Sequence, residues 1–293
     1  MPTKIEKDAV TGQETTGHEW DGIKELNTPL PRWWLYTFYA TIAFAAVYAV
    51  LYPSIPGFRS HSGGVLGYTQ RTALDRSVAD AAAAQKVFRD RISASSLADV
   101  QKDPELFGFA MTGGRAAFNE NCAACHKAGG AGGKGFPNLA DDDWLWGGTL
   151  ADVSQTVTHG IRNTDPNSRQ SMMPRFGADG LLTAAQIGDV ADYVISLSDR
   201  NAAASGDASA VGRGGKLFAD NCASCHGAAG EGNRKVGAPR LNDKIWLYGG
   251  DKASVVQTIT FARNGSMPAW GERLDPVTIK MLTVYVHALG GGE

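Results

Sequence analysis

Every cysteine of the 293-residue chain falls within one of two pentapeptides of the form Cys-x-x-Cys-His. The first spans residues 122–126 and the second spans residues 222–226, so no thiol remains for a disulfide. This spacing lets two thiols add to the vinyl groups of a haem while the imidazole of the next residue reaches the iron. We therefore predict two covalently bound c-type haems. The expected attachment residues are Cys122, Cys125, Cys222 and Cys225, and the expected proximal ligands are His126 and His226.

Two other chemistries share the Cys-x-x-Cys spacing. A redox-active dithiol follows a strand in a βαβ pattern, and no such pattern surrounds either copy. A zinc site would leave unexplained why a histidine follows the second cysteine both times. Both alternatives are therefore weaker than covalent haem attachment.

A run of twenty residues without a charge, Trp33–Tyr52, precedes both pentapeptides. As a helix it would be about 30 Å long, which is enough to cross a bilayer. Aromatic residues lie at both of its ends, as in interfacial belts. A cleaved signal peptide would begin closer to the N-terminus, and a buried core helix would be the other alternative. The sequence favours a single transmembrane helix in a bacterial inner membrane. Since c-type haem is attached outside the cytoplasm, we expect a cytoplasmic N-terminus and periplasmic haem domains.

The part of the chain after residue 108 repeats itself, which indicates two copies of one module. The matched residues include Trp144–Gly148 with Trp246–Gly250, Arg162–Asn163 with Arg263–Asn264, and Met173–Pro174 with Met267–Pro268. The fold class we expect is mainly α, with one N-terminal transmembrane helix followed by two tandem class I cytochrome c domains. The predicted order is a cytoplasmic segment (1–32), a transmembrane helix (33–52), a periplasmic connector with a polar helix over 75–92 (53–108), a first cytochrome c domain (109–200) and a second (207–293), with Ala203–Gly212 as the linker.

The repeat also indicates the sixth iron ligands. Met173 and Met267 correspond to each other and each precedes a proline, which favours an extended loop. Met172 is a rival to Met173, whereas His18, His61, His159 and His287 have no histidine at the matching position of the other copy. Ligation by His and Met fills both axial positions, so we expect electron transfer rather than catalysis by this chain alone.

Several neighbouring residues have expected supporting roles. The carbonyls of Pro137 and Pro239 are placed to orient the proximal imidazoles. Arg162 and Arg263 are candidates to pair with haem propionates. The run Asp141–Asp143 is a candidate docking site for a basic electron donor, although a solvated loop explains it as well. The net charge of −2 argues against a nucleic-acid binder that depends on a basic surface.

Two further segments carry a resemblance to a known family. The strip His-Glu-Trp-Asp-Gly-Ile-Lys-Glu-Leu-Asn-Thr-Pro-Leu-Pro-Arg-Trp-Trp (18–34) leads into the apolar span, and Asp-Pro-Glu-Leu-Phe-Gly-Phe-Ala-Met-Thr-Gly-Gly-Arg (103–115) opens the first haem module. Together they resemble the dihaem subunit (CcoP, subunit III) of cbb(3)-type cytochrome c oxidases. The resemblance covers nearly the whole chain and fits the form of that family with one span.

The resemblance implies a place in a proton-pumping respiratory complex. Electrons would enter from a cytochrome c donor, pass through two haems, and continue to a monohaem subunit and to the haem-copper catalytic subunit that reduces O2 to water. Two alternatives remain: a free membrane-tethered dihaem shuttle, and the cytochrome subunit of a periplasmic dehydrogenase. A tethered shuttle would be expected to have a long flexible linker after the span.

Overall fold

A computed structural model describes residues 4–199 and 207–290, and the contacts divide the chain into two units, Met1–Ala84 and Gln85–Glu293. The first unit contains a hairpin of β1 (Thr15–Trp20) and β2 (Ile23–Leu26), which pair antiparallel. Asp21 and Gly22 join the strands with φ values of 48° and 87°. Asp-Gly favours such a turn because both central residues need positive φ. The hairpin was not predicted for this segment, although its turn signal is present.

Helix α1 (Arg32–Leu51) follows the hairpin, and none of its side chains is buried within the protein. It begins after Pro31, and its length and composition are those of a helix that can cross a membrane. The predicted span 33–52 therefore matches the helix to within one residue at each end.

The connector is more ordered than the sequence suggested. Helix α2 (Gln70–Ala94) is longer than the expected 75–92, and α3 (Leu97–Lys102) follows it. The sequence predicts only a polar helix here, but Ile92 is fully buried against Val100 and Leu106. The reason is local: the bulky apolar residues near the C-terminal end of α2 pack onto α4 (Pro104–Asn121), while the rest of the helix is polar and exposed.

The repeated part of the chain is built from short capped helices. The closing helix of the first copy begins with the predicted capping box of Thr183 and Gln186, and that of the second copy begins with Asp275 as N-cap and Pro276 at the first position. The elements are α5 (Ala123–His126), η1 (Ala128–Gly130), α6 (Leu150–His159), α7 (Ala184–Ser198), α9 (Ala208–Asn221), α10 (Ala223–His226), α11 (Lys252–Phe261) and α12 (Pro276–His287).

The predicted linker Ala203–Gly212 is wrong over its second part. Helix α9 already begins at Ala208, where the side chain of Asp207 accepts a hydrogen bond from the Ser209 amide. The cap and the helix-compatible alanines outweigh the flexible composition of this stretch. The earlier part, 203–206, lies outside the described residues.

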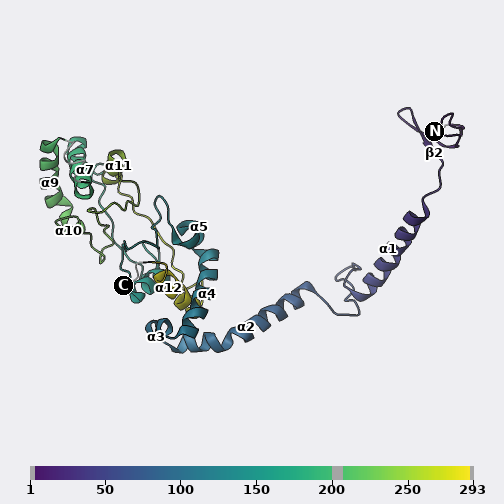
Figure 1. Ribbon diagram of the computed structural model, residues 1–293, viewed down its shortest axis with the longest axis horizontal. Coiled ribbons are helices and arrows are strands. Elements are labelled where there is room, and N and C mark those ends of the chain that lie inside the picture. Colours follow the sequence, from purple (N-terminus) through teal and green to yellow (C-terminus); the bar gives the residue numbers. More distant parts are fainter. Residues whose placement is uncertain (1–3, 200–206, 291–293) are drawn as a thin grey trace. The chain divides into compact units, whose positions relative to one another are not determined.

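The two copies exchange their closing helices. Helix α12 of the second copy packs on α4 and α6 of the first, and α7 of the first copy packs on α9 and α11 of the second. Figure 1 shows α12 beside α4, and α7 beside α9 at the opposite end of this unit. The cores follow the same pattern: Phe118 packs with Leu282 and Tyr285, whereas Phe218 packs with Val190 and Val194. The fold class is confirmed, but each packed half contains segments of both copies.

We call these packed groups the His126 half and the His226 half. The His126 half consists of α4, α5, α6 and α12, and the His226 half consists of α7, α9, α10 and α11.

Candidate functional site

The first Cys-x-x-Cys-His motif continues directly from α4. The Cys122 amide donates to the Phe118 carbonyl, and the His126 amide donates to the Cys122 carbonyl at 2.9 Å. His126 Nδ1 lies 3.1 Å from the Pro137 carbonyl oxygen, which can only accept, so Nδ1 carries the proton. Burial lowers the pKa of His126, and the Pro137 carbonyl opposes this shift. The result is a neutral imidazole whose Nε2 is available to a metal.

The second motif repeats this geometry. His226 Nδ1 lies 3.0 Å from the Pro239 carbonyl, and burial lowers the pKa of His226 as well. The proposed orienting role of the two proline carbonyls is therefore matched by a hydrogen bond at both sites. Such a bond fixes the ring orientation and the tautomer of a metal-binding histidine.

The thiols are not those of a redox-active dithiol. Burial, and to a smaller extent the neighbouring Cys125, raises the pKa of Cys122 to about 11. Burial and Cys225 have the same effect on Cys222, whose pKa is also about 11. Reactive dithiols have lowered thiol pKa values, because the thiolate is the nucleophile.

Both motifs open into one cavity of about 530 Å³. Each copy contributes an aromatic side chain that packs on the other copy. Trp146 packs so closely on Gly237 that a Cβ there would collide with it, and Tyr248 packs on Gly135. Trp146 comes from the first copy but contacts the loop after the second motif, and Tyr248 does the reverse. The cavity is lined by Cys122, Cys125, His126, Cys222, Cys225, His226, Met172, Met173 and Met267, together with mainly apolar side chains.

Met267 lies with the elements of the His126 half. Its backbone pairs with that of Ile161 just beyond α6, through hydrogen bonds of 2.9 and 3.0 Å. Asn163 Nδ2 also donates to the Met267 carbonyl at 2.7 Å. Further along the same segment, Trp270 packs against the same core as Cys122.

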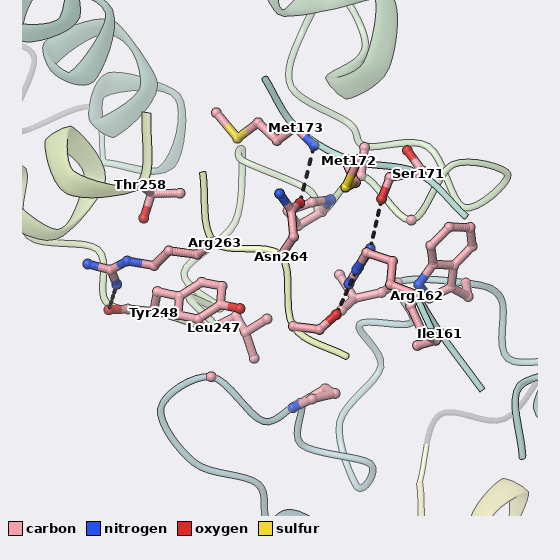
Figure 2. Close-up of a pocket in the computed structure, with 18 of the residues that line it drawn as sticks. Ile161, Arg162, Ser171, Met172, Met173, Leu247, Tyr248, Thr258, Arg263 and Asn264 are labelled. Carbon is pink, nitrogen blue, oxygen red and sulfur yellow. Dashed lines mark hydrogen bonds between the residues drawn. The ribbon is translucent and has the colours of Figure 1, made fainter. Parts of the chain in front are cut away.

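Met173 lies in the His226 half and packs against the core formed by Phe218 and Cys222. Its amide donates to Asn264 Oδ1 at 3.2 Å, as Figure 2 shows. The rival Met172 is 73% exposed, so its side chain is the less sheltered of the two. Met173 therefore packs near the Cys-His motif of the second copy, and the backbone of Met267 is held by residues of the first copy.

The remaining histidines have other surroundings, and none of them lines the cavity in the described part of the chain. His61 lies near the Ser62 carbonyl, and His159 pairs with Asp165 at 3.0 Å. His287 lies 3.4 Å from the side chain of Gln101. The two asparagines that hold the methionine segments were missed as functional residues, although the repeated Arg-Asn pair already marked them.

The run Asp141–Asp143 is only partly available for docking. Asp142 is exposed, whereas Asp141 and Asp143 are half-buried. Burial, followed by the nearby carboxylate of Asp243, raises the pKa of Asp143. The proposed docking of a basic donor at this run stays a prediction.

The donor set fits a c-type haem at each motif. Each half offers two adjacent thiols, an imidazole with a free Nε2 and a thioether from the opposite copy, around a largely apolar cavity. In the described residues, no group of three or more His, Cys, Asp or Glu side chains is arranged to hold a metal ion directly.

These features define a membrane-anchored protein with two cytochrome c domains. Residues 111–198 match the cytochrome c family model, residues 209–286 match that of the cbb3-type cytochrome c oxidase subunit III, and residues 12–59 match the N-terminal domain of cytochrome oxidase-cbb3, FixP.

Curated relatives extend the match over the whole chain. The cbb3-type cytochrome c oxidase subunit CcoP of Azospirillum brasilense is 55% identical, covering 98% of this chain and 99% of its own length. Subunit FixP of Bradyrhizobium sp. (strain ORS 278) is 51% identical over all of both chains, and CcoP of Cereibacter sphaeroides is 48% identical over the same extent. The chain belongs to the CcoP/FixP family of cbb3-type cytochrome c oxidase subunits, as the resemblance of the 18–34 strip indicated.

Proposed function

We propose that this chain carries electrons from a periplasmic cytochrome c donor, through two covalently bound haems, to the monohaem and haem-copper subunits of a cbb3-type oxidase. The observation that carries the proposal is the cavity shared by two complete sets of Cys, His and Met side chains. It is supported by relatives of about 50% identity over the whole chain that are named as subunits of this oxidase. When bound, a c-type haem supplies a one-electron couple at its iron.

The protein residues prepare this couple for transfer rather than for catalysis. At each haem, a histidine and a methionine would hold the iron, which would leave no open site for O2 or another substrate. We therefore propose that this subunit is not an enzyme on its own, and that O2 reduction and proton pumping belong to the assembled complex. The Pro137 and Pro239 carbonyls hold the imidazoles, and the apolar lining excludes water, which limits the reorganisation that electron transfer requires.

We propose a crossed pairing of the axial ligands. Met267 would complete the site of His126, and Met173 would complete that of His226. Met173 packs on the core that includes Cys222, and the backbone of Met267 pairs with that of Ile161 beside the His126 half. Cys122 and Cys125 would attach one haem, and Cys222 and Cys225 the other. This differs from the simplest interpretation of a tandem repeat, in which each copy supplies both of its own ligands.

Replacing one haem site isolates the other and tests the pairing. In a Cys222→Ala/Cys225→Ala background, Met267→His should lower the midpoint potential of the remaining haem, because imidazole stabilises the ferric state more than a thioether does. Met173→His should leave that potential nearly unchanged. The opposite result would establish ligation within each copy, and no response to either change would reject both assignments.

We propose a single-pass topology in the bacterial inner membrane, with residues 1–32 cytoplasmic and the haem domains periplasmic. The support is the uncharged helix α1 and the extracytoplasmic attachment of c-type haem. The reactivity of single introduced cysteines in intact cells tests this topology. A single cysteine replacing Ser77 in the connector should react with an impermeant reagent, and one replacing Thr11 should not.

The ordered connector favours an oxidase subunit over a tethered shuttle. Ile92, at the end of α2, lies in the same core as α4 rather than in a flexible linker. Purification in mild detergent should recover the chain together with high-spin haem and copper. If it separates alone under conditions that keep other membrane complexes intact, the shuttle or the dehydrogenase subunit becomes the better assignment.

A further inference from the structure

One guanidinium group holds both methionine segments. Arg162 Nε donates to the Gly265 carbonyl at 2.6 Å, and its Nη1 donates to the Ser171 carbonyl at 3.0 Å. Gly265 lies two residues before Met267, and Ser171 lies two residues before Met173, so the two carbonyls are equivalent in the repeat. Figure 2 shows both hydrogen bonds converging on the Arg162 side chain.

The repeated arginine of the second copy occupies a different position. Arg263 donates to the Tyr248 carbonyl at 3.3 Å, stacks over the ring of Tyr248 and pairs with Gln257, all within its own copy. The helix ends explain the difference. Helix α6 is capped by Gly160 and Arg162 stands two residues beyond this cap, whereas α11 is capped by Ala262 and Arg263 follows it at once. The one-residue offset points the two arginine side chains into different surroundings.

In residues 4–199 and 207–290, no ion pair joins Arg162 to a carboxylate, and its side chain is partly buried in the wall of the shared cavity. An arginine keeps its proton even when it is partly buried. A positive charge in such surroundings disfavours a further positive charge nearby, and the ferric state of a haem iron carries one more than the ferrous state.

We propose that Arg162 is a positioning residue shared by both haem sites, which fixes the two methionine segments with one guanidinium and raises the reduction potential of both irons. The proposal rests on the function and the methionine ligands proposed above. It predicts that the two sites are coupled: a change at Arg162 acts on both haems, whereas a change at any other ligand-supporting residue of one segment acts mainly on one.

The test uses the full-length chain in its membrane complex with Arg162→Gln, Arg162→Lys and the matched control Arg263→Gln. Two quantities are measured for each haem: the midpoint potential in an optical redox titration, and the weak absorption band of the ferric methionine–iron bond. Arg162→Gln should lower both potentials and weaken the band of both haems. Arg162→Lys keeps the charge but loses the planar fork, so it should weaken both bands and lower the potentials less. Arg263→Gln should leave both bands intact.

The proposal is overturned if Arg162→Gln affects one haem or neither, or if Arg263→Gln affects both equally. If Arg162→Gln does not accumulate with two haems, Arg162→Lys and the unmodified protein still decide. In the unmodified protein, displacement of one methionine by added imidazole should make the second displacement easier, and Arg162→Lys should abolish this cooperativity. Independent displacement in the unmodified protein contradicts the coupling.

The result also separates this proposal from the ligand assignment. Met173→His and Met267→His should each shift the potential of a single haem. If neither shifts a potential, the assignment itself fails. If each shifts one potential but Arg162→Gln leaves both unchanged, only the role of Arg162 fails.

Discussion

The His126 half and the His226 half share the same parts but differ in what surrounds their closing helices. Helix α7 in the His226 half is amphipathic, with the buried residues Ile187, Val190, Ala191 and Val194 on one face. Helix α12 in the His126 half is buried on two sides, and its buried residues run without interruption from Met281 to Val286. The additional partner is the connector, because Met281 and Val284 belong to the core that contains Ile92 and Val100.

This difference concerns which half packs on the connector. The His126 half is joined to the connector by a core of its own, while the described contacts of α7 are with α9 and α11 of the His226 half. The exchange of closing helices then ties the second half to the first. Neither copy alone contains a complete core, so the dihaem part should fold as one cooperative unit.

The largest effect is expected when the two copies are separated. A chain limited to residues 109–200 lacks α12 and Met267, so Phe118 loses Leu282 and Tyr285 from its core. We expect this fragment not to form a stable domain, because a segment of this size with half a core falls below the stability threshold. Circular dichroism and proteolysis would show it. The matched fragment 85–293 retains both halves and should fold, whereas cooperative unfolding of 109–200 alone would refute the exchange.

The next largest effect is expected from shortening a buried side chain in the connector, which should destabilise the His126 half before the His226 half. Ile92→Ala removes a fully buried side chain next to Val100 and Leu106. Such truncations cost about 2–5 kcal/mol. We expect faster hydrogen exchange in α4 and α12 before any change in α7. Ile187→Ala is the matched control, because it should produce the same loss in α7, α9 and α11 first. Equal effects of both variants on all helices would show that the halves do not differ.

The sequence predicted the individual helices better than it predicted which helices pack together. Caps at Thr183 and Asp275 and the apolar spacing of 184–198 are local signals, and they gave the closing helices correctly. The pairing of α12 with α4 is a contact between residues about 170 apart along the chain, and both copies offer nearly the same apolar face. A closing helix therefore fits either core by pattern alone, and the path of the connecting segments 160–183 and 262–275 determines which core it contacts.

At the candidate site, too, the sequence predicts local features but not which residues contact each other. The spacing of Cys222, Cys225 and His226 is enough to predict their roles, because covalent attachment of a haem would constrain neighbours in the sequence. Arg162 and Arg263 look equivalent in the repeat, yet a one-residue offset after the helix caps gives them different partners. Such an offset depends on backbone angles, including the φ of 48° at Arg162, which residue identity does not specify.

A moderate effect is expected from Lys280, which joins α12 to the connector. Its Nζ donates to the carbonyls of Ile92, Ser93 and Ser95 at 3.0, 2.9 and 2.6 Å, at the C-terminal end of α2. The Ile92 carbonyl also accepts from the Ser95 amide at 3.3 Å. The last carbonyls of a helix have few helical donors, and the negative end of the helix dipole favours a cation there. Lys280→Met keeps the apolar stem and should cost about 1.5–3 kcal/mol, as for hydrogen bonds to a charged group.

Thermal unfolding with Lys252→Met as control would measure the Lys280 contribution. Lys252 pairs with Asp192 on the surface of the His226 half at 2.7 Å. Exposed pairs of this kind contribute about 0–1 kcal/mol. If the two variants lower the unfolding temperature equally, Lys280 does not secure the connector as we infer.

The smallest expected effect concerns acid stability, for which we compare one arginine–aspartate pair at each half: Arg213 with Asp189, and Arg89 of α2 with Asp275. In the His226 half, the hydrogen bond from Arg213 is the main cause that lowers the pKa of Asp189. In the His126 half, burial would raise the pKa of Asp275, but hydrogen bonds from Thr278, and then Arg89, lower it on balance. Both carboxyls therefore stabilise the fold above their unfolded pKa of about 3.9 and lose this contribution as the pH falls through the folded value.

The two pairs differ in how much of the lowered pKa depends on the arginine. Arg213→Gln should return the pKa of Asp189 most of the way to its ordinary value. Arg89→Gln should change that of Asp275 less, because the side chain and amide of Thr278 still donate to the carboxylate. Carboxyl titration by NMR would measure both. Loss of Arg213 should then flatten the dependence of stability on pH below about pH 4 more than loss of Arg89 does. Equal shifts would mean that the N-cap contacts of Asp275 add little, and that at these ion pairs the two halves are alike.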